Sequence, residues 1–460
     1  MKWLPAPAGR PGRGAEALAI AKSRTAPDAR TVALETLDAV LRRRLAFEAV
    51  TEGSGDWANL DPRDRSFAFN LVATALRRLG QVDAVVAALL HRPLPERDHW
   101  ARTLLRLGVC QLVFLKTPAH AAVDTTVDLA RRYRQGRHLA LINALLRRVA
   151  REGAVMVAAQ DAARLNTPGW LWQSWSRVYG SATCRRIAEA HLEEPPLDLT
   201  PRTDPGTVAD RLGAELLPTG TVRLRTREGP LTALPGFEQG EWWVQDAAAA
   251  LPVRLLGEIG GRRVIDLCAA PGGKTAQLAA AGALVTAVDR APNRVARLRD
   301  NLARLGLPAR IVTADVAEWR PDQPADAVLL DAPCTATGTI RRHPDVAWIK
   351  RPEDVEALAA AQRRLLTAAA GMLRPGGVLV YCVCSLQSEE GPDHAAWVAG
   401  SEGLLRLEAV TTDPAGGAAR HALADLPAAL TADGQLRTFP FFLSRSGGMD
   451  GFYAVRMRRT

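Results

Sequence analysis

Hydrophobic residues recur three and four positions apart through most of residues 29–158. This spacing is typical of amphipathic helices. It is found in TVALETLDAVLRRRL, DRSFAFNLVATALRRLGQVDAVVAALL, WARTLLRLGVCQLVFL and AAVDTTVDLARRY. Pro93, Pro95 and Pro118 separate the helical runs. The pattern therefore predicts an all-α domain over residues 27–158.

The pattern changes after Trp242 to short apolar runs that alternate with amphipathic stretches. The runs are RRVIDL, ALVTAV, ARIVTA, DAVLL and GVLVYCV, and stretches such as NRVARLRDNLARLG separate them. This alternation indicates an α/β domain with a largely parallel, doubly wound, Rossmann-like sheet. We expect that domain to span residues 246–460, with a connecting subdomain at 159–245 and a flexible leader at 1–26.

Length and composition indicate a globular protein. A chain of 460 residues that is 47% hydrophobic can bury two or three cores. No apolar run reaches the roughly 18 to 20 residues that a membrane-spanning helix needs, and we see no secretory signal. The six cysteines have no metal-ligand spacing, which favours free thiols in a reducing compartment. We therefore expect a cytoplasmic protein, monomeric and without a membrane partner.

The net charge of +10 is concentrated in the first third of the chain. Residues 27–150 carry nineteen basic and thirteen acidic side chains, and residues 1–26 carry five and one. A basic surplus suits a polyanionic partner such as a nucleic acid, because neutralising phosphates releases counterions. A solvated helix surface explains the charge equally well, so both readings stay open at this point.

Each apolar run of the α/β region ends in a loop or a polar residue. In a doubly wound sheet, ligands bind at the carboxyl ends of the strands. The first run leads into DLCAAPGGKT, whose glycines let a ligand approach the backbone and which matches neither GxGxxG nor a P-loop. Asp289 follows Asp266 at about the spacing of a ribose-binding carboxylate, and Asp315 ends the third run near the place of an adenine. These features predict a site for an adenosine-containing ligand without a long phosphate chain.

The last two strand ends carry thiols, Cys334 and Cys384. A single buried cysteine is ordinarily an inert small hydrophobe. Two at adjacent strand ends beside an adenosine pocket indicate chemistry instead. We expect Cys382 and Cys384 to point to opposite faces of their strand, and no His or further Cys completes a tetrahedral set nearby, so no metal site is expected.

In these motifs the chain resembles the RNA cytosine-5 methyltransferases. It is most similar to their bacterial small-subunit (16S) ribosomal RNA branch, of the Sun/Fmu type, whose N-terminal domain is NusB-like. The resemblance rests on DLCAAPGGKT, VDRAPNRVARLRDNLARLG, TAD, LLDAPCTATGTIRRHPDV, LRPGGVLVYCVCSLQSEE and DGFYAVRM, in that order, and on PAHAAVDTTVDLA and INALLRR in the helical region. The chain departs from the family at Thr335, at Val383 and in the segment LDLTPRTDP, where the family usually has Ser, Thr and an Arg-Val-Asn segment.

The resemblance implies S-adenosylmethionine as the methyl donor. It implies that the donor pocket is lined by Cys268, Ala269, Ala270, Pro271, Gly272, Gly273, Lys274, Asp289, Asp315 and Asp331. It also implies that Cys384 attacks the base and that Cys334 assists release. Asp331 is the candidate to hydrogen-bond the cytosine during the reaction.

The expected substrate is a cytosine in a single-stranded loop or bulge of ribosomal RNA, since the base must be unstacked to reach the pocket. Arg341, Arg342 and His343 are candidates for holding the flanking phosphates, and a solvated turn is the alternative for them. A transfer RNA methyltransferase remains the nearest rival function. A non-catalytic RNA-binding regulator and a DNA cytosine-5 methyltransferase are disfavoured because both thiols, Cys334 and Cys384, are present.

Overall fold

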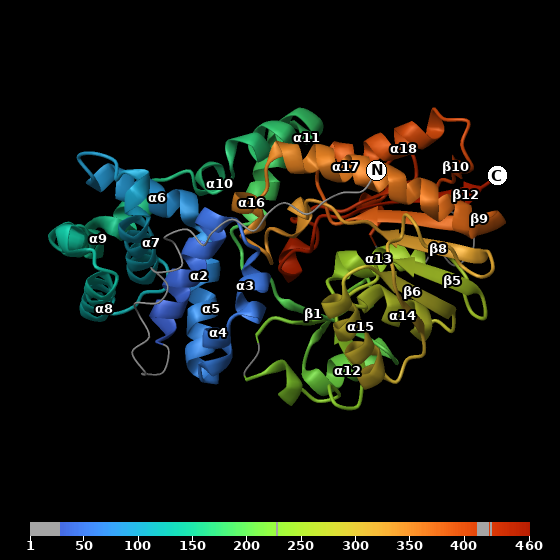
Figure 1. Ribbon diagram of the computed structural model, residues 1–460, viewed down its shortest axis with the longest axis horizontal. Helices are drawn as coiled ribbons and strands as arrows, with labels where there is room; N and C mark the ends of the chain where they lie inside the picture. Colours follow the sequence, from blue (N-terminus) through green and yellow to red (C-terminus); the bar gives the residue numbers. More distant parts are fainter. Residues whose placement is uncertain (1–27, 227–228, 412–422, 424–425) are drawn as a thin grey trace, which may run out of the picture. The chain divides into compact units, whose positions relative to one another are not determined.

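The computed structural model describes residues 28–226, 229–411, 423 and 426–460. The expected leader at 1–26 lies outside the described residues. The chain divides into two compact units, one ending at Gln160 and one beginning at Asp161, and each is described by itself (Figure 1). The segment expected to be a connecting subdomain falls almost wholly within the second unit.

The described part of the first unit consists of helices and the turns between them, as the three-four spacing predicts. Its α-helices are α2 (Ala29–Arg43), α3 (Phe47–Gly53), α4 (Gly55–Asn59), α5 (Pro62–Arg77), α6 (Leu79–Leu89), α7 (His99–Val113), α8 (Ala119–Arg132) and α9 (Leu139–Ala158), with short 3-10 helices η1 (Glu96–Asp98) and η2 (Gly136–His138). Helix α5 begins where it does because Asp61 accepts a hydrogen bond from the amide of Asp64 at 2.9 Å and Pro62 occupies the first turn. Helix α7 packs against α2, α5, α6, α8 and α9 and so forms the centre of the bundle.

The second unit opens with two helices and a small antiparallel sheet. The helices are α10 (Ala162–Leu165) and α11 (Gly169–Ala190), and the sheet has the order β2-β3-β1-β4. Its strands are β1 (Leu197–Pro201), β2 (Glu215–Leu216), β3 (Val222–Leu224) and β4 (Trp242–Val244), and the helices α12 (Pro205–Leu212) and η3 (Leu231–Ala233) lie between them in the sequence. The core of this sheet is built on Trp242, which is fully buried.

A larger sheet follows, with the order β10-β12-β9-β8-β5-β6-β7 and β11 paired to β12. Its strands are β5 (Arg263–Leu267), β6 (Leu284–Asp289), β7 (Arg310–Thr313), β8 (Ala325–Asp331), β9 (Leu373–Val383), β10 (Leu405–Leu407), β11 (Leu436–Arg437) and β12 (Tyr453–Arg459). Strands β5 to β9 pair in parallel, and β12 is antiparallel to β9. The chain runs from β5 outward to β7 and then returns to β8 on the other side of β5. The switch point of the sheet therefore lies between β5 and β8, where ligands bind in such folds.

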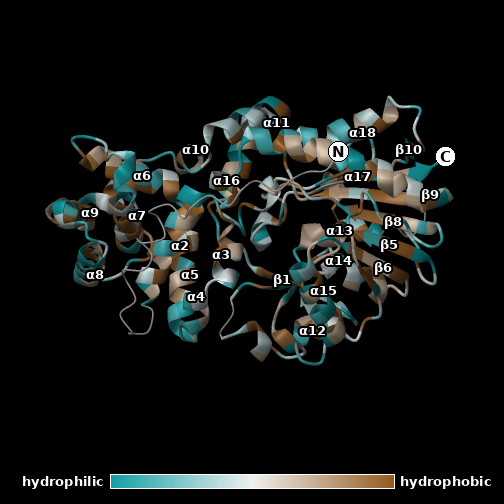
Figure 2. Ribbon diagram, viewed as in Figure 1, coloured by the Kyte–Doolittle hydropathy of each residue, from teal (hydrophilic) through white to brown (hydrophobic). Residues whose placement is uncertain are grey.

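Helices cover both faces of the large sheet. The α-helices of this part of the chain are α13 (Ala247–Arg254), α14 (Gly273–Ala280), α15 (Pro292–Leu305), α16 (Val346–Ile349), which packs with α11, α17 (Pro352–Met372) and α18 (Pro392–Ala399), and the 3-10 helices are η4 (Thr337–Thr339), η5 (Ser388–Glu390), η8 (Pro427–Ala429) and η9 (Ser444–Ser446). Figure 1 shows α17 and α18 on one face and α13, α14 and α15 on the other. Figure 2 shows hydrophobic residues concentrated on the strands of this sheet, while the helices carry both hydrophobic and hydrophilic positions.

Strand β9 alternates strictly between these two faces. Val380 and Cys382 pack toward α13 and α14, whereas Tyr381 and Val383 pack toward α17 and α18. Cys384 also packs on the α13 side. The expectation that Cys382 and Cys384 point to opposite faces is therefore wrong, because residues two apart in a strand share a face.

Candidate functional site

The loop between β5 and α14 is held close to helix α15. Cys268 has a positive φ of 61° and Gly272 one of 107°, and a Cβ at Gly272 would come 2.5 Å from a methyl carbon of Leu298. Only glycine fits such a position without displacing its neighbour. Asn301 of α15 donates a hydrogen bond to the carbonyl of Pro271 at 2.9 Å. The loop is thus fixed in one conformation at the switch point of the sheet.

Asp289, the last residue of β6, fastens this loop from the neighbouring strand. Its carboxylate is buried and accepts hydrogen bonds from the amides of Ala270 at 3.2 Å and Ala291 at 3.1 Å. Arg294 lies 3.4 Å from the same carboxylate. A carboxylate has about four acceptor positions, so Asp289 retains capacity for hydroxyl groups of a ligand.

Asp315, after β7, is exposed, unlike Asp289. Its Oδ1 accepts a hydrogen bond from the amide of Ala317 at 2.9 Å, and its carbonyl accepts from Trp319 at 2.8 Å. The residue thus closes a turn at the strand end and leaves a carboxylate edge toward solvent.

Asp331, at the end of β8, forms an ion pair with Lys274 of the loop helix α14. The Nζ of Lys274 lies 2.8 Å from Oδ2 of Asp331, and the thiol of Cys382 lies 3.4 Å from Oδ1. Burial lowers the pKa of Lys274, but the charge of Asp331 and the nearby thiols outweigh burial and raise that pKa overall. Lys274 also lies over the ring of Phe452 at 4.9 Å, a contact that keeps a cation in place.

Asp266 lies beneath this pair on β5 and is completely buried. Its Oδ2 accepts a hydrogen bond from the Thr275 hydroxyl at 2.6 Å, while Oδ1 has no hydrogen-bond partner among the residues that the structure describes. Burial raises the pKa of Asp266 to about 7, against the effect of the Thr275 hydrogen bond. The sequence singled out this residue only by its spacing from Asp289, and nothing in the pattern signalled its protonation.

The two cysteines at the strand ends face one another. The sulfur of Cys334, in the loop after β8, lies 3.5 Å from the sulfur of Cys384, directly after β9. Both residues are half-buried. The hydrogen bond with Cys384, together with burial, raises the pKa of Cys334 well above the ordinary thiol value. Burial likewise raises the pKa of Cys268 to about 12, so Cys268 lines the loop as a neutral thiol.

The residue that follows each cysteine is bound to one buried carboxylate, that of Glu390 in η5. Oε1 of Glu390 accepts from the amide of Thr335 at 2.8 Å, and Oε2 accepts from the hydroxyl of Ser385 at 2.5 Å and from the hydroxyl of Thr335. Sequence reasoning missed Glu390, because a Glu in the run SLQSEE resembles any helix-start acid and its bonds are long-range.

The three residues expected to contact RNA phosphates are not alike. The side chain of Arg341 is 1% exposed, lies 3.3 Å from Asp246 and donates to the carbonyl of Gly447. Its burial argues against the phosphate contact predicted for it. Arg342 is 31% exposed and donates from Nε to Asp450 at 2.9 Å, and His343 is half-buried.

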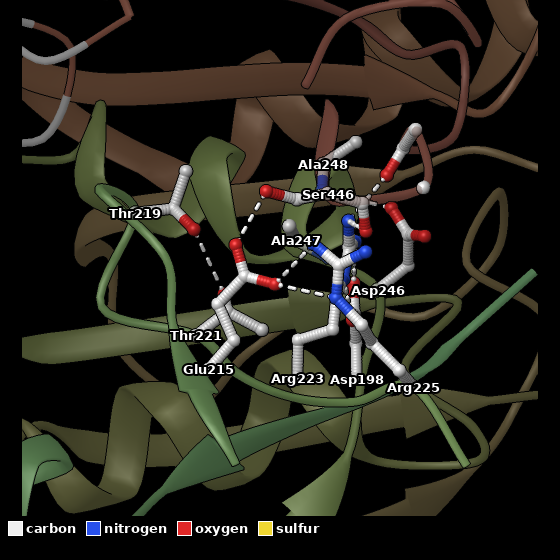
Figure 3. Close-up of polar contacts among 12 residues, drawn as sticks. Asp198, Glu215, Thr219, Thr221, Arg223, Arg225, Asp246, Ala247, Ala248 and Ser446 are labelled. Carbon is white, nitrogen blue, oxygen red and sulfur yellow. Dashed lines mark hydrogen bonds and ion pairs between the residues drawn. The ribbon is translucent and has the colours of Figure 1, made fainter. Parts of the chain in front are cut away.

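Arg341 belongs to a buried ionic network that joins the small sheet to the C-terminal loop. Figure 3 shows its other part, in which Arg223 of β3 binds Asp198 of β1 with two hydrogen bonds of 2.6 Å. Arg223 also donates to the carbonyl of Gly448 at 2.7 Å. Asp246 accepts from the amide of Asp450 at 3.0 Å. The segment LDLTPRTDP, where the chain departs from the family it resembles, thus contributes a buried structural carboxylate through Asp198.

Two negative findings concern the described residues only. Among them, no cluster of three or more His, Cys, Asp and Glu side chains is suited to holding a metal ion. No helix in that part of the chain is long and apolar enough to cross a membrane.

Comparisons with known proteins agree with this architecture. Residues 254–455 match the family model described as 16S rRNA methyltransferase RsmB/F, and residues 27–151 match that of the NusB family. The chain is 36% identical over 370 residues to ribosomal RNA small subunit methyltransferase B of Salmonella arizonae, which covers 75% of this chain and 86% of that protein.

Two solved structures share the fold. The crystal structure of PH0851 has a TM-score of 0.70 at 21% identity and covers 95% of this chain and 100% of that one. NSun6 from Pyrococcus horikoshii, solved with SFG, has a TM-score of 0.52 at 20% identity and covers 64% of this chain and 98% of that one. Both the helical first unit and the mostly parallel sheet of the second are thereby confirmed as expected.

Proposed function

The chain belongs to the RsmB/F family of 16S ribosomal RNA methyltransferases, and from this premise we propose that it transfers a methyl group from S-adenosylmethionine to carbon 5 of a cytosine in RNA. The observation that carries the proposal is the approach of two thiols to 3.5 Å at adjacent strand ends, beside the Asp331–Lys274 pair. An RNA methyltransferase acting on a ring nitrogen or an oxygen has no need of two such thiols, whereas carbon 5 of cytosine must be activated covalently.

The residues at the switch point fit S-adenosylmethionine. Asp289 keeps acceptor positions for the ribose hydroxyls, and the amides at the start of α14 suit the carboxylate of the amino acid moiety. Asp315 offers an exposed carboxylate at the end of β7 for the adenine amino group. The residues that hold the donor are Cys268, Ala269, Ala270, Pro271, Gly272, Gly273, Lys274, Asp289, Asp315 and Asp331. When bound, S-adenosylmethionine supplies an electrophilic methyl group.

The protein's own groups activate the base and then release it. The thiolate of Cys384 adds to carbon 6, the new bond is S–C, and the electron pair of the 5,6 double bond makes carbon 5 nucleophilic. Asp331, oriented by Lys274, accepts a hydrogen bond from the exocyclic amine as charge develops on the ring. After carbon 5 is methylated, Cys334 acts as the base that takes the carbon-5 proton, or assists that base. The double bond between carbons 5 and 6 then re-forms, and the S–C bond to Cys384 breaks.

The RNA substrate is a small-subunit ribosomal RNA, since the curated relatives carry that activity in their names. The target cytosine lies in an unstacked loop or bulge, because only an extruded nucleobase can reach the thiols at the strand ends. The NusB-like unit, with its surplus of six positive charges over residues 27–150, contributes affinity for the phosphate backbone.

Bisulfite sequencing of RNA from cells with and without this protein tests the proposal directly. One or more cytosines of 16S ribosomal RNA that resist conversion in the wild type should become convertible in the deletion strain. A change confined to transfer RNA would assign the protein to the transfer RNA enzymes instead. No change in either RNA, with methyl transfer from S-adenosylmethionine also absent in vitro, would refute the cytosine-5 activity.

A further inference from the structure

Glu390 is the residue through which the two cysteine loops are joined. Its side chain is completely buried and accepts four hydrogen bonds. Thr335 gives two of them, from its amide and its hydroxyl, Ser385 gives one at 2.5 Å, and Gln362 of α17 gives one at 3.1 Å. Thr335 follows Cys334 and Ser385 follows Cys384, so one carboxylate fixes the positions of both thiols.

The partners of Glu390 suit a negatively charged carboxylate. All four groups donate to the carboxylate, and two of them, the backbone amide of Thr335 and the side-chain amide of Gln362, can only donate, so Oε1 of Glu390 accepts from both. The Gln362 amide is oriented by His394, whose Nε2 lies 2.8 Å from its oxygen. Burial raises the pKa of Glu390, and the hydrogen bonds from Ser385 and Thr335 oppose that rise.

The carboxylate is not placed symmetrically between the thiols. On the Cys334 side it binds both the backbone amide and the hydroxyl of the next residue, while on the Cys384 side it binds only a hydroxyl. The pKa of Cys334 is raised first by the hydrogen bond with Cys384, then by burial and by the charge interaction with Cys384, and after these by the charge of Glu390. Lys274 and Arg342 both interact electrostatically with Cys384, and each is also paired with a carboxylate, Lys274 with Asp331 and Arg342 with Asp450.

The remaining ionisable groups around the carboxylate do not cancel this asymmetry. Tyr381 of β9 donates its hydroxyl to the backbone carbonyl of Glu390 at 2.6 Å, and burial raises its pKa well above the ordinary value, so it stays neutral. His394 of α18 is neutral, because burial lowers its pKa to about 4. Arg437 of β11 donates to the carbonyl of Ser385 at 2.7 Å, which adds a positive charge on the Cys384 side.

We propose that Glu390 is a positioning residue that makes the two thiols unequal. It ties the residue after each cysteine to one carboxylate and sets a negative charge beside Cys334, so that Cys384 is the sulfur that attacks. Two sulfurs 3.5 Å apart cannot both carry a charge at little cost, so a small difference in surroundings decides which one does. The inference rests on the proposed function, in which Cys384 is the nucleophile.

Alkylation of the full-length protein by iodoacetamide across a pH series, with each cysteine quantified by mass spectrometry, measures the inequality without any RNA. In the wild type, Cys384 should be modified at a lower pH than Cys334. In Glu390→Gln the negative charge is lost, and Cys334 should become modified at a pH about one unit lower, or about tenfold faster at a given pH. A Cys334 profile identical in Glu390→Gln and wild type would overturn the proposal.

Glu389→Gln is the matched control, because Glu389 is the adjacent glutamate, is half-exposed and lies 3.8 Å from Arg177 outside the network. Its thiol profiles should equal those of the wild type, and a shift as large as that in Glu390→Gln would refute a specific role for Glu390. Thermal unfolding monitors folding. If Glu390→Gln does not fold, Thr335→Val removes one bond on the Cys334 side, and an unchanged Cys334 profile in that variant would count against the proposal.

The same proteins separate this inference from the proposed function. A wild type with unequal thiols that methylates no RNA cytosine would defeat the proposed function and leave the role of Glu390 in thiol ionisation. Cytosine methylation through Cys384 with no change of the thiol profiles in Glu390→Gln would do the reverse. Both would be supported by three results together. The wild type forms the RNA adduct, kcat is lower in Glu390→Gln and recovers in Glu390→Asp, and the Cys334 profile is shifted in Glu390→Gln.

Discussion

The sulfur atoms of Cys334 and Cys384 lie 3.5 Å apart although fifty residues separate them along the chain. They meet because β8 and β9 are parallel neighbours in register, with Asp331 opposite Cys382, so their carboxyl ends reach the same edge of the sheet. Helix α17 fills the sequence between them. The crossover connection between the two strands thus brings together two thiols that lie far apart in the sequence and share no local motif.

The two thiols should differ in the species that their variants trap. Cys384→Ala cannot form the bond to carbon 6, so it should be inactive and leave no covalent RNA complex. Cys334→Ala should still attack and methylate but stall before elimination, so a protein–RNA adduct that survives denaturing gels should accumulate and require the methyl donor. The opposite pattern, with the adduct trapped by Cys384→Ala, would make Cys334 the nucleophile.

Asp289→Ala should weaken binding of S-adenosylmethionine by roughly tenfold to a hundredfold, since hydrogen bonds to a charged group contribute about 1.5 to 3 kcal/mol. Calorimetric titration of the purified protein measures this. Asp300→Ala, which removes an exposed carboxylate from α15, is the control and should bind as the wild type does. Undiminished affinity in Asp289→Ala would remove that residue from the pocket.

Asp266→Asn should change how stability depends on pH. Burial raises the pKa of Asp266 to about 7 in the folded protein, whereas an Asp in the unfolded chain has a pKa of about 3.9. Between these values the folded state binds more protons than the unfolded state, so rising pH lowers the free energy of unfolding. The variant loses this contribution, and its stability should fall less from pH 4 to 7, by up to a few kcal/mol.

Urea unfolding at several pH values measures this difference, with Asp326→Asn as a control of opposite sign. The hydrogen bond from Arg374 lowers the pKa of Asp326, so Asp326 adds stability as pH rises above the acid range. Equal pH dependence in wild type and Asp266→Asn would show that Asp266 is already ionised in the folded protein.

The first unit should fold alone as residues 27–160 and bind RNA in a salt-dependent way. Six phosphate contacts on single-stranded RNA correspond to a slope of about −4 in log affinity against log salt. Fluorescence anisotropy with a labelled single-stranded RNA measures the slope, and circular dichroism measures the helix content. Absent or salt-independent binding would move recognition to the second unit, whose charge is nearly balanced.

Much of the fold follows from the sequence because its signals are periodic. The three-four spacing of the first unit and the alternation of short apolar runs with helices fix the element types, and polar strand ends mark the edge where Asp289, Asp331 and Cys384 gather. The family match confirms the resemblance carried by those motifs. Their placement follows from one rule, that parallel strands end at one edge of the sheet.

What the sequence did not give depends on long-range packing. Glu390 accepts a hydrogen bond from Thr335, fifty-five residues away, and Arg341 pairs with Asp246, ninety-five residues away. No local sequence pattern therefore signals either environment. The prediction that Cys382 and Cys384 point to opposite faces was wrong for a simpler reason. Successive residues of a strand alternate faces, so residues two apart lie on the same face.

Gly338 and Gly451 link the backbone of Cys384 to a segment near the end of the described chain. Gly338 donates to the carbonyl of Cys384 at 3.0 Å and accepts from the amide of Gly451 at 2.8 Å, and a Cβ on Gly338 would come 1.9 Å from the carbonyl oxygen of Gly451. Strand β12, which follows, pairs with β9 next to Cys384. During synthesis Cys384 therefore emerges from the ribosome well before the segment that holds its backbone. A chain cut before Gly451 would carry both thiols but lack this support, so we expect such a truncated chain to be inactive.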